Sequence, residues 1–274
     1  MEVKIHQTSV VEPSVELGNG VEIGPFCYLS GNVKISDRVK LLNNVCVTGN
    51  TEIGSDCVIF PFACIGYVPQ DLKYRGEESR ILIGKNNIIR EYVTVHPGTE
   101  KGGMLTKIGD GNLLMVSTHV AHDCRIGNAN VIANYVGLAG HVVIENNVVI
   151  GGLVGVHQYV RIGSFAFIAG GSMVRQDVPP FVSVCGNSAR AYGINSIGLT
   201  RAGFTQNELA FLRKLFRVFF KSKFAFEERI KLVEELIDHK LERQDFLKSL
   251  FLEFVKGSSR GVVKYASDQG EESD

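Results

Sequence analysis

The sequence predicts a parallel β-helix followed by an α-helical domain, and three observations lead to this fold class. Aliphatic residues return at every sixth position over most of the chain up to Val174. The chain holds 30 glycines and no tryptophan, which is typical of a fold with many tight turns. Beyond Pro180 the spacing of the apolar residues changes to that of an amphipathic α-helix. A period of six fits neither an α-helix nor an ordinary strand, but it matches the hexapeptide repeat of a parallel β-helix.

The repeat runs in two long stretches. Steps of six from Ile5 reach isoleucine, leucine or valine at every position as far as Ile65, and the same holds from Ile108 to Val174. Three repeats close one triangular coil, so the chain returns about 4.8 Å further along the axis after about 18 residues. We expect the aliphatic residue to point inward. The residue four places later also faces in, at a tighter position that suits small side chains.

Two segments interrupt the repeat. Residues 66–82 and 96–107 carry polar and charged groups where the pattern requires aliphatic side chains. Both are expected to be loops that leave the coil, and long loops on a rigid scaffold are often functional. The alternative is that they are tolerated insertions.

The spacing of apolar residues predicts three helices after the repeat ends. Thr205–Glu208 has the form of a capping box, and apolar residues then follow at helical spacing. A second helix is expected over about 227–238 and a third around 246–254. The expected organisation is a β-helix over 1–188, a helical domain over 189–266 and an acidic tail over 267–274.

Composition excludes several classes of protein. Lysine plus arginine equal aspartate plus glutamate at 29 each, so no net charge marks the chain as a nucleic-acid-binding protein. No stretch approaches the roughly 20 apolar residues of a membrane-spanning helix. The N-terminus lacks the basic end and apolar run of a signal peptide, which predicts a cytoplasmic protein. The six cysteines form no C-x-x-C pair and are expected to be free. Among them, Cys27, Cys57 and Cys124 fall at the inward small position.

Histidines indicate where the chemistry lies. One coil after His122 is residue 140 and two coils after it is residue 158, so His141, His157 and Gln158 fall near one edge of successive coils. His122 is at a corner, where its side chain can project outward, and Asp123 could orient the ring. A histidine with an ordinary pKa near 6.5 suits general-base catalysis at neutral pH. A histidine cluster could instead bind zinc, as in metal-dependent hydratases of the γ-class carbonic anhydrase type.

A basic stripe lies on the first expected helix. Arg213, Arg217 and Lys221 are spaced four residues apart, so they share one face. The stripe is either a solvated helix face or a binding site for an acidic protein.

Several motifs resemble one family, the UDP-N-acetylglucosamine acyltransferases. The loop Gln70-Asp71-Leu72-Lys73-Tyr74, together with His119-Val120-Ala121-His122-Asp123-Cys124 and Leu138-Ala139-Gly140-His141, carries the resemblance. Val156-His157-Gln158, Gln176-Asp177-Val178-Pro179-Pro180, Arg201-Ala202-Gly203-Phe204 and Ser259-Arg260-Gly261 extend it into the helical region.

The resemblance implies a left-handed β-helix and a cytoplasmic homotrimer that begins lipid A biosynthesis. Such an enzyme moves an (R)-3-hydroxyacyl chain from acyl carrier protein to the 3-hydroxyl of UDP-N-acetylglucosamine, and it needs no cofactor or metal. His122 would be the general base, Asp123 would orient it, and the N–H of Gly140 would bind the oxyanion.

The resemblance also implies roles in substrate binding. The family's residues for the sugar and acyl sites match Gln70, Asp71, Lys73, His119, His141, His157 and Gln158, and those for the nucleotide end match Asn195 and Arg201. The family residue that sets acyl length matches Gly170, and a glycine there leaves room for a long chain. The basic stripe of Arg213, Arg217 and Lys221 would meet the carrier protein.

Overall fold

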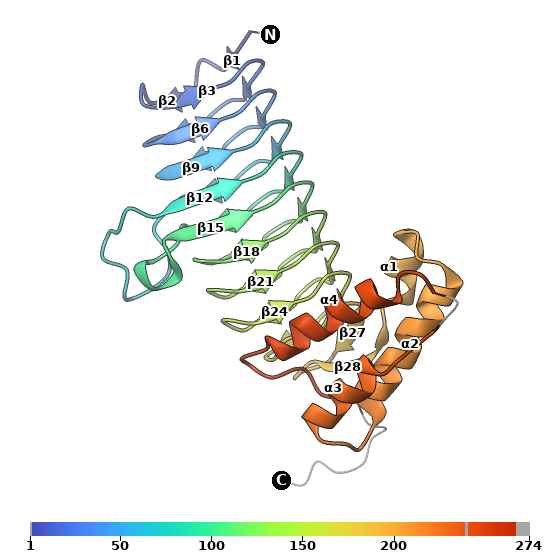
Figure 1. The fold of residues 1–274 in the computed structure, drawn as a ribbon. Helices are drawn as coiled ribbons and strands as arrows, with labels where there is room; N and C mark the ends of the chain where they lie inside the picture. The colour runs from blue at the N-terminus through green and yellow to red at the C-terminus, as the bar shows by residue number, and fades with distance from the viewer. Residues whose placement is uncertain (1, 239–240, 267–274) are drawn as a thin grey trace.

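The structure is a left-handed parallel β-helix with helices gathered at its C-terminal end (Figure 1). The computed structural model describes residues 2–238 and 241–266. The acidic tail expected over 267–274 lies outside the described residues. Short strands stack coil upon coil from the N-terminus, and helix α4 lies along the last coils (Figure 1). The predicted fold class is therefore confirmed.

The strands form three sheets, one on each side of the triangular coil. Sheet A contains β1 (Lys4–Ile5), β4 (Glu22–Ile23), β7 (Lys40–Leu41), β10 (Val58–Ile59), β13 (Ile88–Ile89), β16 (Leu113–Leu114), β19 (Val131–Ile132), β22 (Val149–Ile150), β25 (Phe167–Ile168), β27 (Val182–Cys185) and β28 (Arg190–Ile194). Sheet B contains β2 (Val10–Val11), β5 (Tyr28–Leu29), β8 (Cys46–Val47), β11 (Cys64–Ile65), β14 (Thr94–Val95), β17 (His119–Val120), β20 (Gly137–Leu138), β23 (Gly155–Val156) and β26 (Met173–Val174). Sheet C contains β3 (Glu16–Leu17), β6 (Val33–Ile35), β9 (Asn50–Ile53), β12 (Arg80–Ile83), β15 (Leu105–Ile108), β18 (Arg125–Ile126), β21 (Val143–Ile144) and β24 (Arg161–Ile162).

The register of the sheets follows the six-residue period. Ile23 pairs with Leu41, and Ile132 pairs with Ile150, so each inward aliphatic side chain stacks on its equivalent in the next coil. From Val21 onward the inward residues are almost fully buried, and the smaller position holds Cys27, Cys57 and Cys124 as expected. Apolar side chains thus form a continuous core along the axis, which is the main stabilising contribution.

The two loops are shorter than the sequence predicted. Strand β12 begins at Arg80 and strand β15 at Leu105, so the loops cover 66–79 and 96–104. The reason is that Ile81 and Thr106 already face the core, two residues before the aliphatic positions that mark the repeat. Both loops project from the same side of the coil stack (Figure 1). The second one contains a short 3₁₀ helix, η1 (Glu100–Gly102).

The C-terminal part consists of α1 (Ser196–Arg201), α2 (Gln206–Lys221), α3 (Phe226–Glu234) and α4 (Gln244–Lys256). Thr205 and Glu208 form the predicted capping box at the start of α2. Its buried face includes Phe211, Phe216 and Phe219. The expected domain boundary at 188 falls in the turn between β27 and β28, which pair antiparallel. Within the described residues, no helix is long and apolar enough to span a membrane.

Candidate active site

A histidine–carboxylate pair lies in the turn between β17 and β18, at the corner between sheets B and C. His122 Nδ1 is 2.8 Å from Asp123 Oδ2. Asp123 adopts φ 60°, a left-handed conformation that aspartate tolerates better than most residues. The two side chains leave the coil, as predicted, but they are buried, with 6% and 3% exposed. The pair therefore lies in a site from which most of the solvent is excluded.

Loop 96–104 holds the carboxylate of this pair. The Thr99 N–H donates to Asp123 Oδ1 at 2.9 Å, and the Thr99 hydroxyl donates to Asp123 Oδ2 at 2.7 Å. A Cβ on Gly102 would collide with the carboxylate, so the backbone approaches it as closely as a glycine permits. The sequence indicated that this loop is functional. It did not single out Thr99, because nothing in a linear pattern shows which loop residue reaches a corner 24 positions away.

His141 packs against His122 from the next coil. The two rings meet edge to face with centroids 5.1 Å apart, and Tyr159 stacks on the far side of His141 at 4.3 Å. Tyr159, rather than His157, thus continues the stack that the sequence predicted, because it lies one full coil beyond His141. Burial lowers the pKa of His141, although the charge of Asp123 opposes this effect.

Two further imidazoles line the sheet B side of the pair. His119 Nδ1 is 2.7 Å from the hydroxyl of Thr94, and its ring meets that of His96 edge to face. Burial lowers the pKa of His119 and lowers that of His96 to about 4, and the charge of His122 adds to both shifts. Both imidazoles are therefore neutral near pH 7. The sequence did not single out His96, because it lies outside the repeat of corner positions.

Gly140 borders the imidazole of His122 directly. A Cβ at this position would collide with the ring, so the close approach requires glycine. Among the described residues, the backbone N–H of Gly140 has no hydrogen-bond acceptor. An N–H that is free and next to the base is suited to bind a developing negative charge.

Loop 66–79 brings Asp71 towards the histidines. The Lys73 N–H donates to Asp71 Oδ1 at 2.9 Å and lowers the pKa of this carboxyl group, with smaller contributions from the charges of His122 and His141. Gln70 and Lys73 are exposed on the same loop. The loop therefore presents polar and charged groups beside the buried pair.

An apolar groove of about 380 Å³ follows the outer face of sheet B from the same site. It is lined by His119, Gly137, Leu138, Ala139, Gly155, Val156, His157, Met173, Val174 and Arg175. Of the residues expected to contact substrate, His119 and His157 line this groove, and Gln158 is exposed next to His157. Gly170 lies in the turn before β26, where a Cβ would approach the carbonyl oxygen of Gly152 at 3.2 Å. It does not line the groove.

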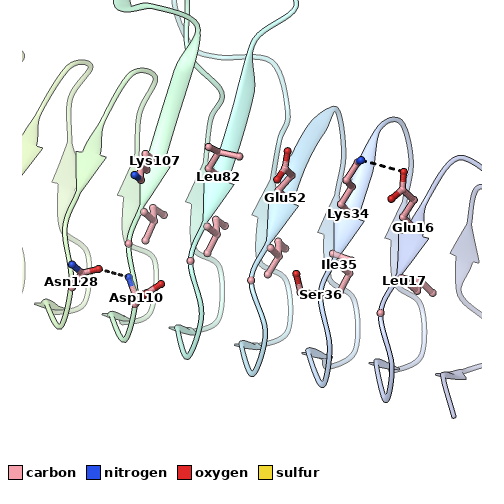
Figure 2. Close-up of a pocket in the computed structure, with 17 residues that line it drawn as sticks. Glu16, Leu17, Lys34, Ile35, Ser36, Glu52, Leu82, Lys107, Asp110 and Asn128 are labelled. Atoms are coloured by element: carbon pink, nitrogen blue, oxygen red, sulfur yellow. Dashed lines mark hydrogen bonds and ion pairs between the residues drawn. The ribbon is translucent and has the colours of Figure 1, made fainter. Parts of the chain in front are cut away.

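A larger hollow of about 670 Å³ lies on the outer face of sheet C and is shown in Figure 2. Its charged side chains include Glu16 and Lys34, which form an exposed ion pair at 3.3 Å (Figure 2). Such surface pairs contribute little free energy, and no histidine or cysteine lines this hollow. The chemistry is therefore assigned to the corner between sheets B and C.

The expected nucleotide and carrier residues lie elsewhere in the chain. Asn195 caps helix α1, and its Nδ2 donates at 3.0 Å to the carbonyl of Phe165, in the turn between sheets C and A. Arg201 is exposed at the end of α1. Within one chain these residues and His122 are thus at different corners of the coil. Arg213, Arg217 and Lys221 are exposed along α2, as the spacing predicted.

The side chains around His122 were also considered as a cation site. His122, Asp123 and His141 offer ligand atoms within 4.8 Å of one another. However, His122 Nδ1 already contacts Asp123, and both oxygens of Asp123 accept hydrogen bonds from Thr99. The donor set therefore fits an oriented base better than a metal centre.

A hexapeptide β-helix with an oriented imidazole next to an apolar groove defines a hexapeptide-repeat acyltransferase. Residues 105–140 match the bacterial transferase hexapeptide model, and residues 177–263 match the model of UDP-N-acetylglucosamine O-acyltransferase domain 2. The acyl-[acyl-carrier-protein]–UDP-N-acetylglucosamine O-acyltransferase of Thermodesulfovibrio yellowstonii is 44% identical over 95% of this chain and 99% of its own length. The chain belongs to the UDP-N-acetylglucosamine O-acyltransferase family.

Solved structures agree with this assignment. The LpxA protein of Acinetobacter baumannii is 42% identical, with a TM-score of 0.89 over 95% of this chain and 99% of that one. The UDP-N-acetylglucosamine acyltransferase of Bacteroides fragilis is 35% identical, with a TM-score of 0.91 over 95% of this chain and 100% of that one. These relatives are acyltransferases, so the hypothesis of a metal-dependent hydratase finds no support.

Proposed function

We propose that this chain transfers an (R)-3-hydroxyacyl chain from acyl carrier protein to the 3-hydroxyl of UDP-N-acetylglucosamine, the first step of lipid A biosynthesis. The observation that carries this proposal is the buried His122–Asp123 pair at the head of an apolar groove. The names of the relatives specify the acyl donor and the nucleotide sugar. The pair supplies a base, and the groove accepts a hydrocarbon chain.

The reaction needs one proton acceptor. An ionised carboxylate only accepts hydrogen bonds, so Asp123 selects the tautomer of His122 with the proton on Nδ1. Nε2 then takes the proton of the sugar hydroxyl as the oxygen attacks the thioester carbonyl. The carbon–oxygen bond forms and the carbon–sulfur bond breaks, and the proton on Nε2 passes to the departing thiolate. The N–H of Gly140 stabilises the oxyanion of the intermediate.

The transfer is direct, without an acyl-enzyme intermediate. Cys124 is the nearest thiol in sequence, but it points into the core and donates to the carbonyl of Ala139 at 3.2 Å. Burial raises its pKa to about 12, and only the thiolate is an effective nucleophile. Cys124 therefore serves as a packing residue.

Further residues complete the substrate site in this proposal. Gln70, Asp71, Lys73, His141, His157 and Gln158 contact the sugar and the acyl group, and Asn195 and Arg201 contact the nucleotide. Because Asn195 and His122 lie at different corners of the stack of coils, one substrate can meet both only between two copies of the chain. This arrangement supports a homotrimer whose sites lie between subunits. We also propose that the enzyme acts in the cytoplasm and binds its carrier protein through α2.

The proposal is tested by incubating the purified protein with (R)-3-hydroxyacyl carrier protein and UDP-N-acetylglucosamine. We expect the 3-O-acylated nucleotide sugar and free carrier thiol in equal amounts, with the rate unchanged after treatment with a chelator. Absence of product with every acyl length would refute the proposal. Loss of activity on chelation, restored by zinc, would support the hydratase-type metal site instead.

A further inference from the structure

Two thiols lie side by side on the outer face of sheet B. Cys46 in β8 and Cys64 in β11 are register partners. Each comes one position before an inward residue that is fully buried, Val47 and Ile65, so both cysteine side chains are on the opposite face of the sheet. Both thiols are free and half-buried. The proposed acyl transfer uses neither of them.

The pair stands apart from its surroundings. Three other thiols, those of Cys27, Cys57 and Cys124, face the core and donate to backbone carbonyls. Along sheet B the register neighbours of the pair are Tyr28 on one side and Thr94 on the other. The outer face of sheet B therefore offers two sulfur ligands at this point.

The spacing of the pair decides what can join the two sulfurs. Register partners on one face of neighbouring parallel strands are about 4.8 Å apart. A disulfide requires Cβ atoms that are closer, about 3.5–4.5 Å apart, so direct oxidation would have to pull two coils together. A metal–thiolate bond is about 2.3 Å long, so two such bonds in line span about 4.6 Å. A single cation between the sulfurs thus fits the strands as they stand.

The number of ligands selects the cation. Thiolates favour Cu(I), zinc and iron–sulfur clusters. A zinc site takes three or four protein ligands, and an iron–sulfur cluster takes four. In the part of the chain that the structure describes, the only group of three His, Cys, Asp or Glu ligands is the one at His122, so the cysteine pair completes neither of these sites. Cu(I) is a soft cation that two thiolates in line can satisfy.

Electrostatics at the pair also favours a cation. Burial raises the pKa of Cys64, and the charge of a Cys46 thiolate raises it further. Burial likewise raises the pKa of Tyr67, at the start of loop 66–79, and the charges of both cysteines add to this shift. Two thiolates at this spacing repel each other, and a positive ion between them would remove that repulsion.

The geometry points to a Cu(I) site formed by Cys46 and Cys64, with one ion per chain. Each thiol releases its proton to the solvent as its sulfur–copper bond forms. Two thiols and one Cu⁺ therefore give a bis-thiolate complex with one negative charge and two protons. Copper keeps its +1 state, so the step needs no oxidant or reductant. The ion joins β8 to β11, two strands before His119 in sheet B, and uses no residue of the proposed active site.

The test titrates the purified, reduced protein with Cu(I) in the absence of oxygen, in competition with a chromogenic Cu(I) chelator. We expect the wild type to take one ion per chain from the chelator, and X-ray absorption at the copper edge to show two sulfur neighbours. Bound copper should also raise the melting temperature, because the ion binds the folded chain. None of these measurements depends on acyl transfer.

Three variants locate the ion. Cys46→Ser and Cys64→Ser each remove one ligand and should lower the affinity at least about 100-fold, since the loss of a hydrogen-bond partner to a ligand alone costs 10- to 100-fold. Cys185→Ser removes an exposed thiol outside the pair and should bind as the wild type does. Circular dichroism of the metal-free variants checks their fold.

Failure of the wild type to take copper from the chelator would overturn the inference. Equal affinity in the wild type and in the double variant Cys46→Ser with Cys64→Ser would do the same, because the ion would then lie elsewhere. The sulfur count at copper in the wild type decides the matter even if a variant misfolds, since fewer than two sulfur neighbours excludes this pair.

Discussion

In the proposed mechanism the imidazole of His122 is the general base, with its Nδ1 in contact with Asp123 and its Nε2 left for the substrate. For His122→Ala we expect kcat to fall by about 10²- to 10⁴-fold, the usual contribution of a general base. Binding of UDP-N-acetylglucosamine should change little, because the side chain lies outside the aliphatic core. Single-turnover assays and calorimetry measure the two effects. His6→Ala, an exposed substitution in the first coil, is the control. Retention of more than about a tenth of the wild-type turnover would place the base elsewhere.

Thr99 acts on the reaction through Asp123. Thr99→Val removes the hydroxyl that donates to Asp123 Oδ2 but keeps the backbone N–H bonds. A hydrogen bond to a charged group contributes about 1.5–3 kcal/mol, so we expect kcat to fall about 10-fold with KM for the nucleotide sugar unchanged. Thr99→Ser should restore most of the activity because it restores the donor. If serine were no better than valine, the loss would reflect packing rather than orientation of the carboxylate.

His96 makes stability depend on pH. Burial lowers its pKa to about 4, whereas an unfolded histidine titrates near 6.5. Between these values the unfolded chain binds a proton that the folded chain does not. Stability from this residue is therefore complete above about pH 6.5 and is lost as the pH falls towards about 4. The loss is at most about 3–4 kcal/mol, at about 1.4 kcal/mol for each pKa unit.

Urea unfolding of the wild type and of His96→Gln between pH 7 and pH 4 measures this contribution. We expect the difference between the two free energies of unfolding to change in favour of the variant as the pH falls. A difference that stays constant over the whole range would show that His96 titrates normally in the folded protein. Because both proteins share all their carboxylates, the other acid-sensitive groups cancel in this comparison.

At the scale of elements, the exposed face of α2 carries a prediction about the carrier protein. Arg213 and Arg217 are exposed, while Lys221 lies over the ring of Tyr265 at 4.9 Å. Reversal of two charges, Arg213→Glu with Arg217→Glu, should raise KM for the acyl carrier protein about 10-fold at low salt, because charge complementarity at an interface steers association and suppresses mismatched partners. The effect should shrink as salt increases.

An acyl donor that lacks the carrier protein shows whether the change on α2 affects carrier binding alone. With an acyl-pantetheine substrate, the doubly substituted enzyme should match the wild type. Lys4→Glu with Lys107→Glu makes the same change in charge far from α2 and should leave KM for the carrier protein unaltered. An equal effect of both pairs would mean that net charge, rather than this helix face, controls binding.

The loops are the elements that convert a structural repeat into a catalytic site. Their polar composition indicated function, and loop 96–104 binds the carboxylate of Asp123, which orients the base in the proposed mechanism. The end of each loop was predicted too far along the sequence. The next strand already has one inward residue before the aliphatic position that marks the repeat. Ile81 and Thr106 are such residues, and a threonine does not stand out in an aliphatic pattern.

At the scale of the whole molecule, the separation of Asn195 from His122 predicts a site shared between subunits. We expect His122→Ala and Arg201→Ala to be weakly active alone. Unfolding and refolding the two together should restore activity at about a quarter of the sites, as random assembly of a closed ring requires. Mixing without unfolding is the control and should restore none. If co-refolding restored nothing although trimers formed, both residues would belong to one chain's site.

The stack of coils was predictable from the sequence because its cause is local. A repeat of six with inward aliphatic residues has one way to bury them, and each coil serves as the template for the next. The capping box at Thr205 is equally local, since its partners are three residues apart. The corner position of His122 followed from counting coils, and the family's motifs pointed to the same residue.

The contacts that complete the site were decided by the tertiary structure. Thr99 reaches Asp123 across 24 positions, Tyr159 takes the place next to His141, and Met173 lies over Gly155 from the neighbouring strand. Each of these contacts depends on where a loop folds back or how a side chain turns, which no period in the sequence specifies. The sequence by itself determined the scaffold and the reactive pair, because short-range patterns encode both. Only the folded chain decided how the base is oriented and which residues line the groove, because those depend on residues that meet only after the coils have stacked.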